Sequence, residues 1–166
     1  MAQRTSSSRT TRDNRPRWLA EIPRTLLSRP TFTGQRRMFA ATLALRLAGA
    51  GLLGWIGYIH WHLWREGYKY IPTNGPLFLL DAIAAVLLGL VLLTWPRPLA
   101  GLAGAAFTAA TILALVISLS VGLFGFRESI SASSVVQSLA LESVAVIILL
   151  SWTAVTAVAV MRNHRS

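Results

Sequence analysis

The sequence contains no cysteine among its 166 residues. Disulfide bonds, thiolate nucleophiles, iron–sulfur clusters and cysteine-ligated zinc sites are therefore excluded. Methionine occurs only at positions 1, 38 and 161, so the soft ligands expected of a copper carrier are also lacking. The sequence has no Walker loop and no motif that pairs a nucleophile with a general base. We therefore expect a protein that is not an enzyme and that has no cofactor.

Charged residues are also scarce. They make up 13% of the chain, whereas hydrophobic residues make up 54% and the mean hydropathy is +0.54. A soluble domain carries roughly 25% charged residues. The few charges are bunched, and long uncharged runs separate them, as is typical of membrane spans. The sequence therefore predicts an all-α fold, a four-helix transmembrane bundle with a disordered basic N-terminal arm.

The arm is predicted to cover residues 1–37 and to be cytoplasmic. It holds nine of the sixteen Lys and Arg residues, and its Arg- and Ser-rich start has too few apolar side chains to form a core. It also lacks a nucleic-acid-binding fold and interleaved aromatic residues, so we expect no nucleic-acid partner. A bilayer with anionic headgroups is the expected partner, since each basic residue near the surface contributes about 1 kcal/mol. Arg36 and Arg37, directly before the first span, are predicted to contact these headgroups.

Four apolar segments reach the roughly 20 residues that a bilayer requires. The predicted bundle covers residues 38–161, with spans at 38–64, 76–95, 99–124 and 134–161, and a short tail follows at 162–166. With the amino terminus inside, twelve basic residues lie on the cytoplasmic side and three, Arg65, Lys69 and Arg127, lie outside. The excess predicts a multi-pass plasma-membrane protein with both termini in the cytoplasm.

Small and polar residues are regularly spaced in the last two spans, and such residues let membrane helices approach closely. The seam on the third span has three- and four-residue spacings and comprises Gly101, Gly104, Thr108, Thr111, Leu115, Ser118 and Gly122. The polar stripe on the fourth span comprises Ser131, Ser138, Glu142, Thr153 and Thr156. Both patterns favour helix–helix packing, with a pathway for an ion or small solute as the alternative.

Charged residues inside spans are costly, because a charge at the bilayer centre requires a few kcal/mol even on the most lenient scale. A rise of about 1.5 Å per residue puts Asp81 about 7 Å and Glu142 about 12 Å from the outer ends of their helices. His60 lies about 6 Å from the outer end of the first span. These three residues are therefore predicted to share one polar layer. Arg46 lies about 21 Å along its helix from His60 and is expected to reach the cytoplasmic headgroups.

This polar layer has the residue types of a proton relay, or of a divalent-metal site that water completes. The simpler alternative is that the three residues only hydrogen-bond to one another or to the loops. His62 does not extend the layer, because side chains two residues apart on a helix point in nearly opposite directions.

Three runs of the sequence, at 60–64, 67–80 and 122–128, together resemble a family of small four-span membrane proteins of actinobacteria. The resemblance covers about residues 40–160, and the composition, rich in Ala and Arg and poor in Lys, agrees with a high-GC genome. It implies the topology and no mechanism.

Two functions of different classes follow. The first is a non-enzymatic accessory or scaffolding component of a membrane complex, with a homo-oligomer through the third span as one form. The second is a small carrier or sensor that uses Glu142, Asp81 and His60 for protons or a divalent cation. An enzyme that acts on lipid comes third.

Overall fold

The computed structural model describes residues 24–32, 36–125 and 133–163. Four long helices cover most of this part of the chain: α2 (Arg36–Glu66), α3 (Asn74–Thr94), α4 (Pro98–Ser120) and α5 (Ser133–Asn163). A short 3₁₀ helix, η1 (Tyr68–Tyr70), lies between α2 and α3. Each of the four long helices has the length and apolar composition needed to cross a bilayer. The predicted all-α bundle is confirmed, and the chain is a multi-pass membrane protein.

The helix ends differ from the predicted spans by a few residues. The largest difference is at the end of the third span, which was predicted to continue to residue 124, whereas α4 ends at Ser120. Gly122 has a φ of 87° and lies in the left-handed region that favours glycine. Its N–H donates to the Ile117 carbonyl over 3.1 Å, and the same carbonyl accepts from the Val121 N–H over 3.0 Å. Gly122 therefore lies beyond the end of the helix on which the packing seam was predicted.

The part of the predicted arm that the structure describes contains helix. Residues 24–27 form one helical turn, and α2 already includes Arg36 and Arg37. Arg is a good helix former, which allows α2 to begin before the apolar run. Near the turn, the Asn163 side-chain amide at the end of α5 donates to the Thr31 hydroxyl over 2.6 Å. Residues 1–23 of the arm lie outside the described residues.

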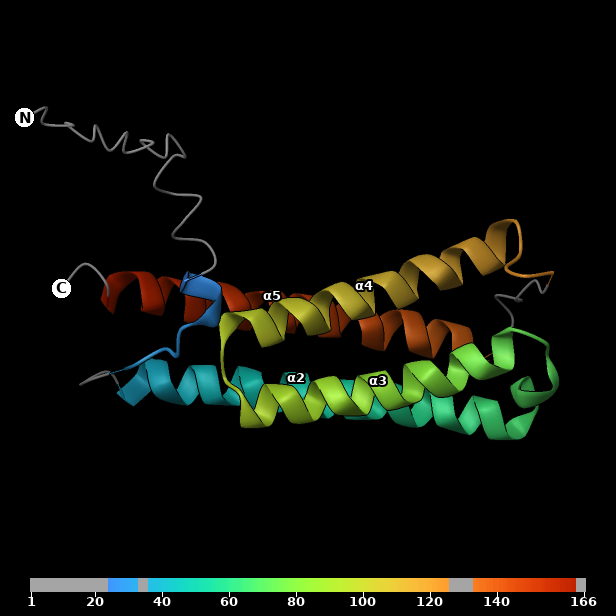
Figure 1. Cartoon of the computed structure of the whole chain (residues 1–166), viewed down its shortest axis with the longest axis horizontal. Helices are drawn as coiled ribbons and strands as arrows, with labels where there is room; N and C mark the ends of the chain where they lie inside the picture. Colours follow the sequence, from blue (N-terminus) through green and yellow to red (C-terminus); the bar gives the residue numbers. More distant parts are fainter. Residues whose placement is uncertain (1–23, 33–35, 126–132, 164–166) are drawn as a thin grey trace, which may run out of the picture.

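The helices run side by side along the long axis of the molecule (Figure 1). α2 packs mainly on α3 and α4 packs mainly on α5, while contacts between α2 and α5 join these two hairpins. α3 and α4 contact each other much less, although only a short turn connects them. Figure 1 shows α4 rising away from α3 as it leaves that turn. We call the end of the bundle where α2 and α4 end, and α3 and α5 begin, the predicted outer end.

Glycines allow the helices within each hairpin to approach closely. A Cβ on Gly57 of α2 would lie 3.0 Å from the Ala82 carbonyl oxygen of α3. A Cβ on Gly101 of α4 would lie 2.6 Å from Cε3 of Trp152 on α5, which is closer than real Cβ contacts come. Helix association in lipid depends on this kind of close van der Waals packing.

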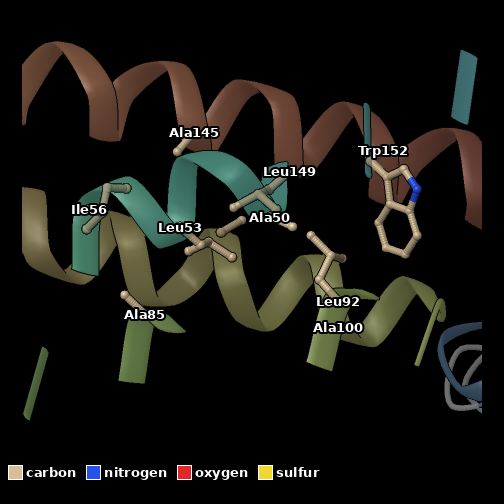
Figure 2. Packing of buried hydrophobic residues seen from close by; sticks show 10 residues of the cluster. Ala50, Leu53, Ile56, Ala85, Leu92, Ala100, Ala145, Leu149 and Trp152 are labelled. Atoms are coloured by element: carbon tan, nitrogen blue, oxygen red, sulfur yellow. The ribbon is translucent and has the colours of Figure 1, made fainter. Parts of the chain in front are cut away.

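The apolar core fills the middle of the bundle and its opposite end, where the described chain begins and ends. Figure 2 shows Leu53 of α2, Leu92 of α3 and Leu149 of α5 converging in this region. All three are fully buried, as is the large side chain of Trp152. The tight packing does not continue to the predicted outer end, where the helices enclose a cavity.

Candidate functional site

A cavity of about 400 Å³ lies between the four helices at the predicted outer end. Its wall includes residues from α2, α3, α4 and α5 and from the connections between them. The three residues of the predicted polar layer, His60, Asp81 and Glu142, all line it. The structure therefore brings these three residues to one cavity from three different helices, while their predicted role as an ion site stays a prediction.

Glu142 of α5 is the most deeply buried of the three, with 2% of its surface exposed. Its Oε2 atom is buried and has no hydrogen-bond partner in the described part of the chain. The Thr111 side chain of α4 interacts with this carboxyl group. A carboxyl group buried with one oxygen unpaired is costly, because desolvation is then uncompensated. Glu142 and Thr111 both line the cavity.

The Thr111 hydroxyl can adopt two hydrogen-bonding arrangements. It lies 2.7 Å from the Thr108 carbonyl oxygen, to which it can donate, and it also contacts the Glu142 carboxyl group. A hydroxyl has one hydrogen and two acceptor lone pairs. When the hydrogen points to Thr108, the hydroxyl accepts from a protonated Glu142; when it points to Glu142, it donates to the carboxylate. The pair can therefore accommodate both protonation states of Glu142 by one hydroxyl rotation.

His60 and Asp81 form a second interacting pair on the cavity wall. The His60 ring is nearly buried, and its Nδ1 atom lies 2.9 Å from the Ile56 carbonyl oxygen. A carbonyl only accepts, so Nδ1 carries the hydrogen in this contact. Asp81 is close enough to interact electrostatically with both His60 and Glu142. Asp81 therefore links His60 and Glu142 electrostatically, because it interacts with each of them.

Aromatic side chains form part of the same wall. The Phe78 ring of α3 lies between two others, with ring centroids 4.4 Å from Tyr68 and 5.5 Å from His60. Phe107 of α4 and Phe124, beyond the end of α4, also line the cavity. The sequence prediction missed these residues. A signal for two of them exists, because Phe78 precedes Asp81 by three residues and Phe107 precedes Thr111 by four, so each pair shares a helix face.

The geometry does not favour a divalent-metal centre. In the ranges that the structure describes, no group of three or more His, Cys, Asp or Glu side chains is placed to hold a metal ion. His62 is directed elsewhere: it is exposed, it pairs with Glu66 at 3.0 Å, and it stacks on Tyr58 with centroids 5.8 Å apart. This agrees with the expectation that His60 and His62 point apart.

The predicted packing seam faces the interior of the chain's own bundle. Five of its predicted members are buried: Gly101, Gly104, Thr108, Thr111 and Ser118. Side chains of α5 occupy this face, with Trp152 against Gly101 and Leu149 against Gly104. The polar stripe of α5 is also turned inward, since Ser138, Glu142 and Thr156 are buried, while Ser131 lies outside the described residues. Gly101 and Gly104 thus contact α5 of the same chain, while Thr111 and Ser118 line the cavity. The predicted homo-oligomer stays a prediction.

Arg46 has partners that the sequence did not predict. Its Nε atom donates to the Leu92 carbonyl over 2.9 Å, and its Nη2 atom donates to the Leu93 carbonyl. Both carbonyls belong to the last turn of α3, where backbone acceptors have no partner within the helix. Arg46 thus caps a neighbouring helix. Arg36 and Arg37 are exposed at the start of α2, and their predicted contact with lipid headgroups stays a prediction.

Fold and site together define a four-helix multi-pass membrane protein with a partly polar cavity near one end. Comparisons with protein families, with curated proteins and with solved structures found no match to this chain. The resemblance to small actinobacterial membrane proteins therefore stays a prediction.

Proposed function

We propose that this protein is a small proton-linked carrier or sensor, and that Glu142 is its proton-exchanging group. One observation carries the proposal: Glu142 is 98% buried on the cavity wall, and its Oε2 atom has no hydrogen-bond partner among the described residues. Ionisable residues inside membrane spans are expensive and commonly mark pathways for protons or ions. An apolar side chain at position 142 would pack into the bundle without this cost.

The surroundings of Glu142 support proton exchange. Asp81 of α3 and His60 of α2 line the same cavity, and η1 contributes the Tyr68 phenol. Among the α4 residues that line the cavity, Thr111 and Ser118 have hydroxyl groups. Chains of carboxylate and imidazole groups are the usual carriers of protons inside membranes. A proton that leaves Glu142 thus has Asp81 and His60 as neighbouring acceptors.

Infrared spectroscopy of the full chain in lipid nanodiscs tests the proposal. The carboxylic-acid C=O band reports protonated side chains, and we expect one such band to disappear as pH is raised. Glu142→Gln removes that band and preserves the shape of the side chain. Glu66→Gln is the matched control, because Glu66 is an exposed carboxylate paired with His62. A titrating band that persists in Glu142→Gln would refute the assignment.

The accessory role in a membrane complex stays a prediction. Large apolar side chains are exposed on all four long helices. Lipid covers such faces as well as a protein partner would. The observations on Glu142 therefore favour the carrier or sensor, in the plasma membrane and with the cavity toward the outside as the charge distribution predicts.

A further inference from the structure

We propose that the cavity binds an amphiphilic organic ammonium ion, whose head group lies between Glu142 and Asp81 and whose apolar body contacts the aromatic wall. This inference rests on the proposed function and names its ligand class. It is carried by two independent features of one cavity. One is the buried carboxyl oxygen without a partner, and the other is the apolar and aromatic character of the remaining wall.

The polar part of the cavity calls for a hydrogen-bond donor with a positive charge. Oε2 of Glu142 can only accept when the group is ionised, and Asp81 is the second carboxylate within electrostatic range. A primary ammonium group has three N–H donors and one charge, so it matches both requirements. The polar residues of α4 that line the cavity are Thr111 and Ser118. Their hydroxyl oxygens can accept from the same donors, and they carry no competing positive charge.

The rest of the wall suits an organic body. The apolar wall includes three leucine and three phenylalanine side chains: Leu63, Leu77, Leu115, Phe78, Phe107 and Phe124. A volume of about 400 Å³ lies within the range of small-molecule sites. Aromatic faces also attract organic cations within about 6 Å of the ring centre.

An inorganic cation fits these walls less well. Calcium takes about six to eight oxygen ligands, and magnesium retains several of its waters. The leucine and phenylalanine side chains of the wall offer no ligand atoms. Within the ranges described, His, Cys, Asp and Glu side chains nowhere form a group of three that is placed to hold a metal. An organic cation needs no complete coordination shell, because its apolar body contributes to binding instead.

In this site, the binding of an ammonium ion is accompanied by the release of a proton, so the net charge of the cavity does not change. A protonated Glu142 loses its proton to the aqueous phase, and the resulting carboxylate pairs with the ammonium ion that enters. His60 and Asp81 interact with each other and can compensate charge within the cavity. One ammonium ion therefore exchanges for one proton at Glu142.

Calorimetric titration of the full chain in zwitterionic nanodiscs tests this proposal, with 1-naphthylmethylammonium as the probe. Zwitterionic lipid avoids cation binding to anionic headgroups, and empty nanodiscs correct for partitioning. The neutral isostere 1-naphthylmethanol is the ligand control, and Glu66→Gln is the protein control. We expect saturable binding of the ammonium probe alone, with a Kd that Glu142→Gln raises at least about tenfold, as loss of a charge-assisted hydrogen bond implies. Glu66→Gln should leave the Kd unchanged.

Equal binding of the neutral alcohol, or an unchanged Kd in Glu142→Gln, would overturn the proposal. If Glu142→Gln does not fold, Asp81→Asn decides: a severalfold rise in Kd supports the site, and no rise overturns it. Titrations in two buffers of different ionisation enthalpy count the protons released. Binding without release leaves the ammonium site standing and refutes its link to protons. A titrating Glu142 without probe binding refutes the ammonium site and leaves the proposed function standing.

Discussion

Arg46 of α2 donates from its guanidinium group to the Leu92 carbonyl of α3 over 2.9 Å, and so caps a helix to which it does not belong. The carbonyls of a last helical turn have no partner of their own, and in a bilayer each unsatisfied backbone group costs several kcal/mol. A basic group at a helix C-terminus also interacts favourably with the helix dipole. The pair thus joins α2 to α3 and offsets part of the penalty of a charge inside a span.

Arg46→Met tests this role. We expect it to lower the free energy of unfolding by about 1–3 kcal/mol, because the Leu92 and Leu93 carbonyls lose their donors. The measurement is the thermal unfolding of purified protein in detergent, followed by tryptophan fluorescence. Arg65→Met is the control, since Arg65 is exposed at the end of α2 over the Trp61 ring. Equal stability of the two variants would show that Arg46 does not hold α3.

Gly101→Ala should weaken the contact between α4 and α5. Its Cβ would lie 2.6 Å from Cε3 of Trp152, so a buried indole ring would have to move. Overpacking of this kind destabilises by about 1–3 kcal/mol. Gly51→Ala is the matched control, because nothing lies within 4 Å of a Cβ at that position. The same unfolding measurement should separate the variants, and a Gly101→Ala protein as stable as Gly51→Ala would contradict the observed packing.

The four helices could be predicted because apolar length and uncharged runs are properties of the sequence alone. The common depth of His60, Asp81 and Glu142 could also be predicted, since the rise per residue fixes position along a helix. The partners of Arg46 could not, because Leu92 and Leu93 lie 46 and 47 residues away in the chain and only the pairing of α2 with α3 brings them near. The end of α4 was missed because a hydropathy pattern does not show the left-handed conformation of Gly122.

The orientation of the bundle can be tested by labelling, because the chain has no cysteine of its own. Tyr70→Cys places a thiol in the exposed connection between α2 and α3, and Arg162→Cys places one near the end of α5. The excess of basic residues near the termini predicts that a membrane-impermeant maleimide labels only Tyr70→Cys on intact cells. Both thiols should react after lysis. Labelling of Arg162→Cys alone on intact cells would reverse the assigned orientation.

The last prediction separates a working Glu142 from one that merely holds helices together. A buried polar group without a hydrogen-bond partner costs about 1–3 kcal/mol, and an apolar residue of similar volume does not have this cost. Glu142 has one oxygen without a partner among the described residues. Glu142→Leu therefore removes an unpaired buried acceptor and few favourable hydrogen bonds. We therefore expect this variant to be at least as stable as the parent chain while it loses the titrating infrared band and the binding of 1-naphthylmethylammonium. Ser138→Ala, on the same buried face of α5, controls for the loss of a polar group. A Glu142→Leu protein that unfolds far more easily than the parent chain and Ser138→Ala would assign Glu142 to helix packing. Such a loss of stability would mean that the carboxyl group makes favourable bonds with its neighbours.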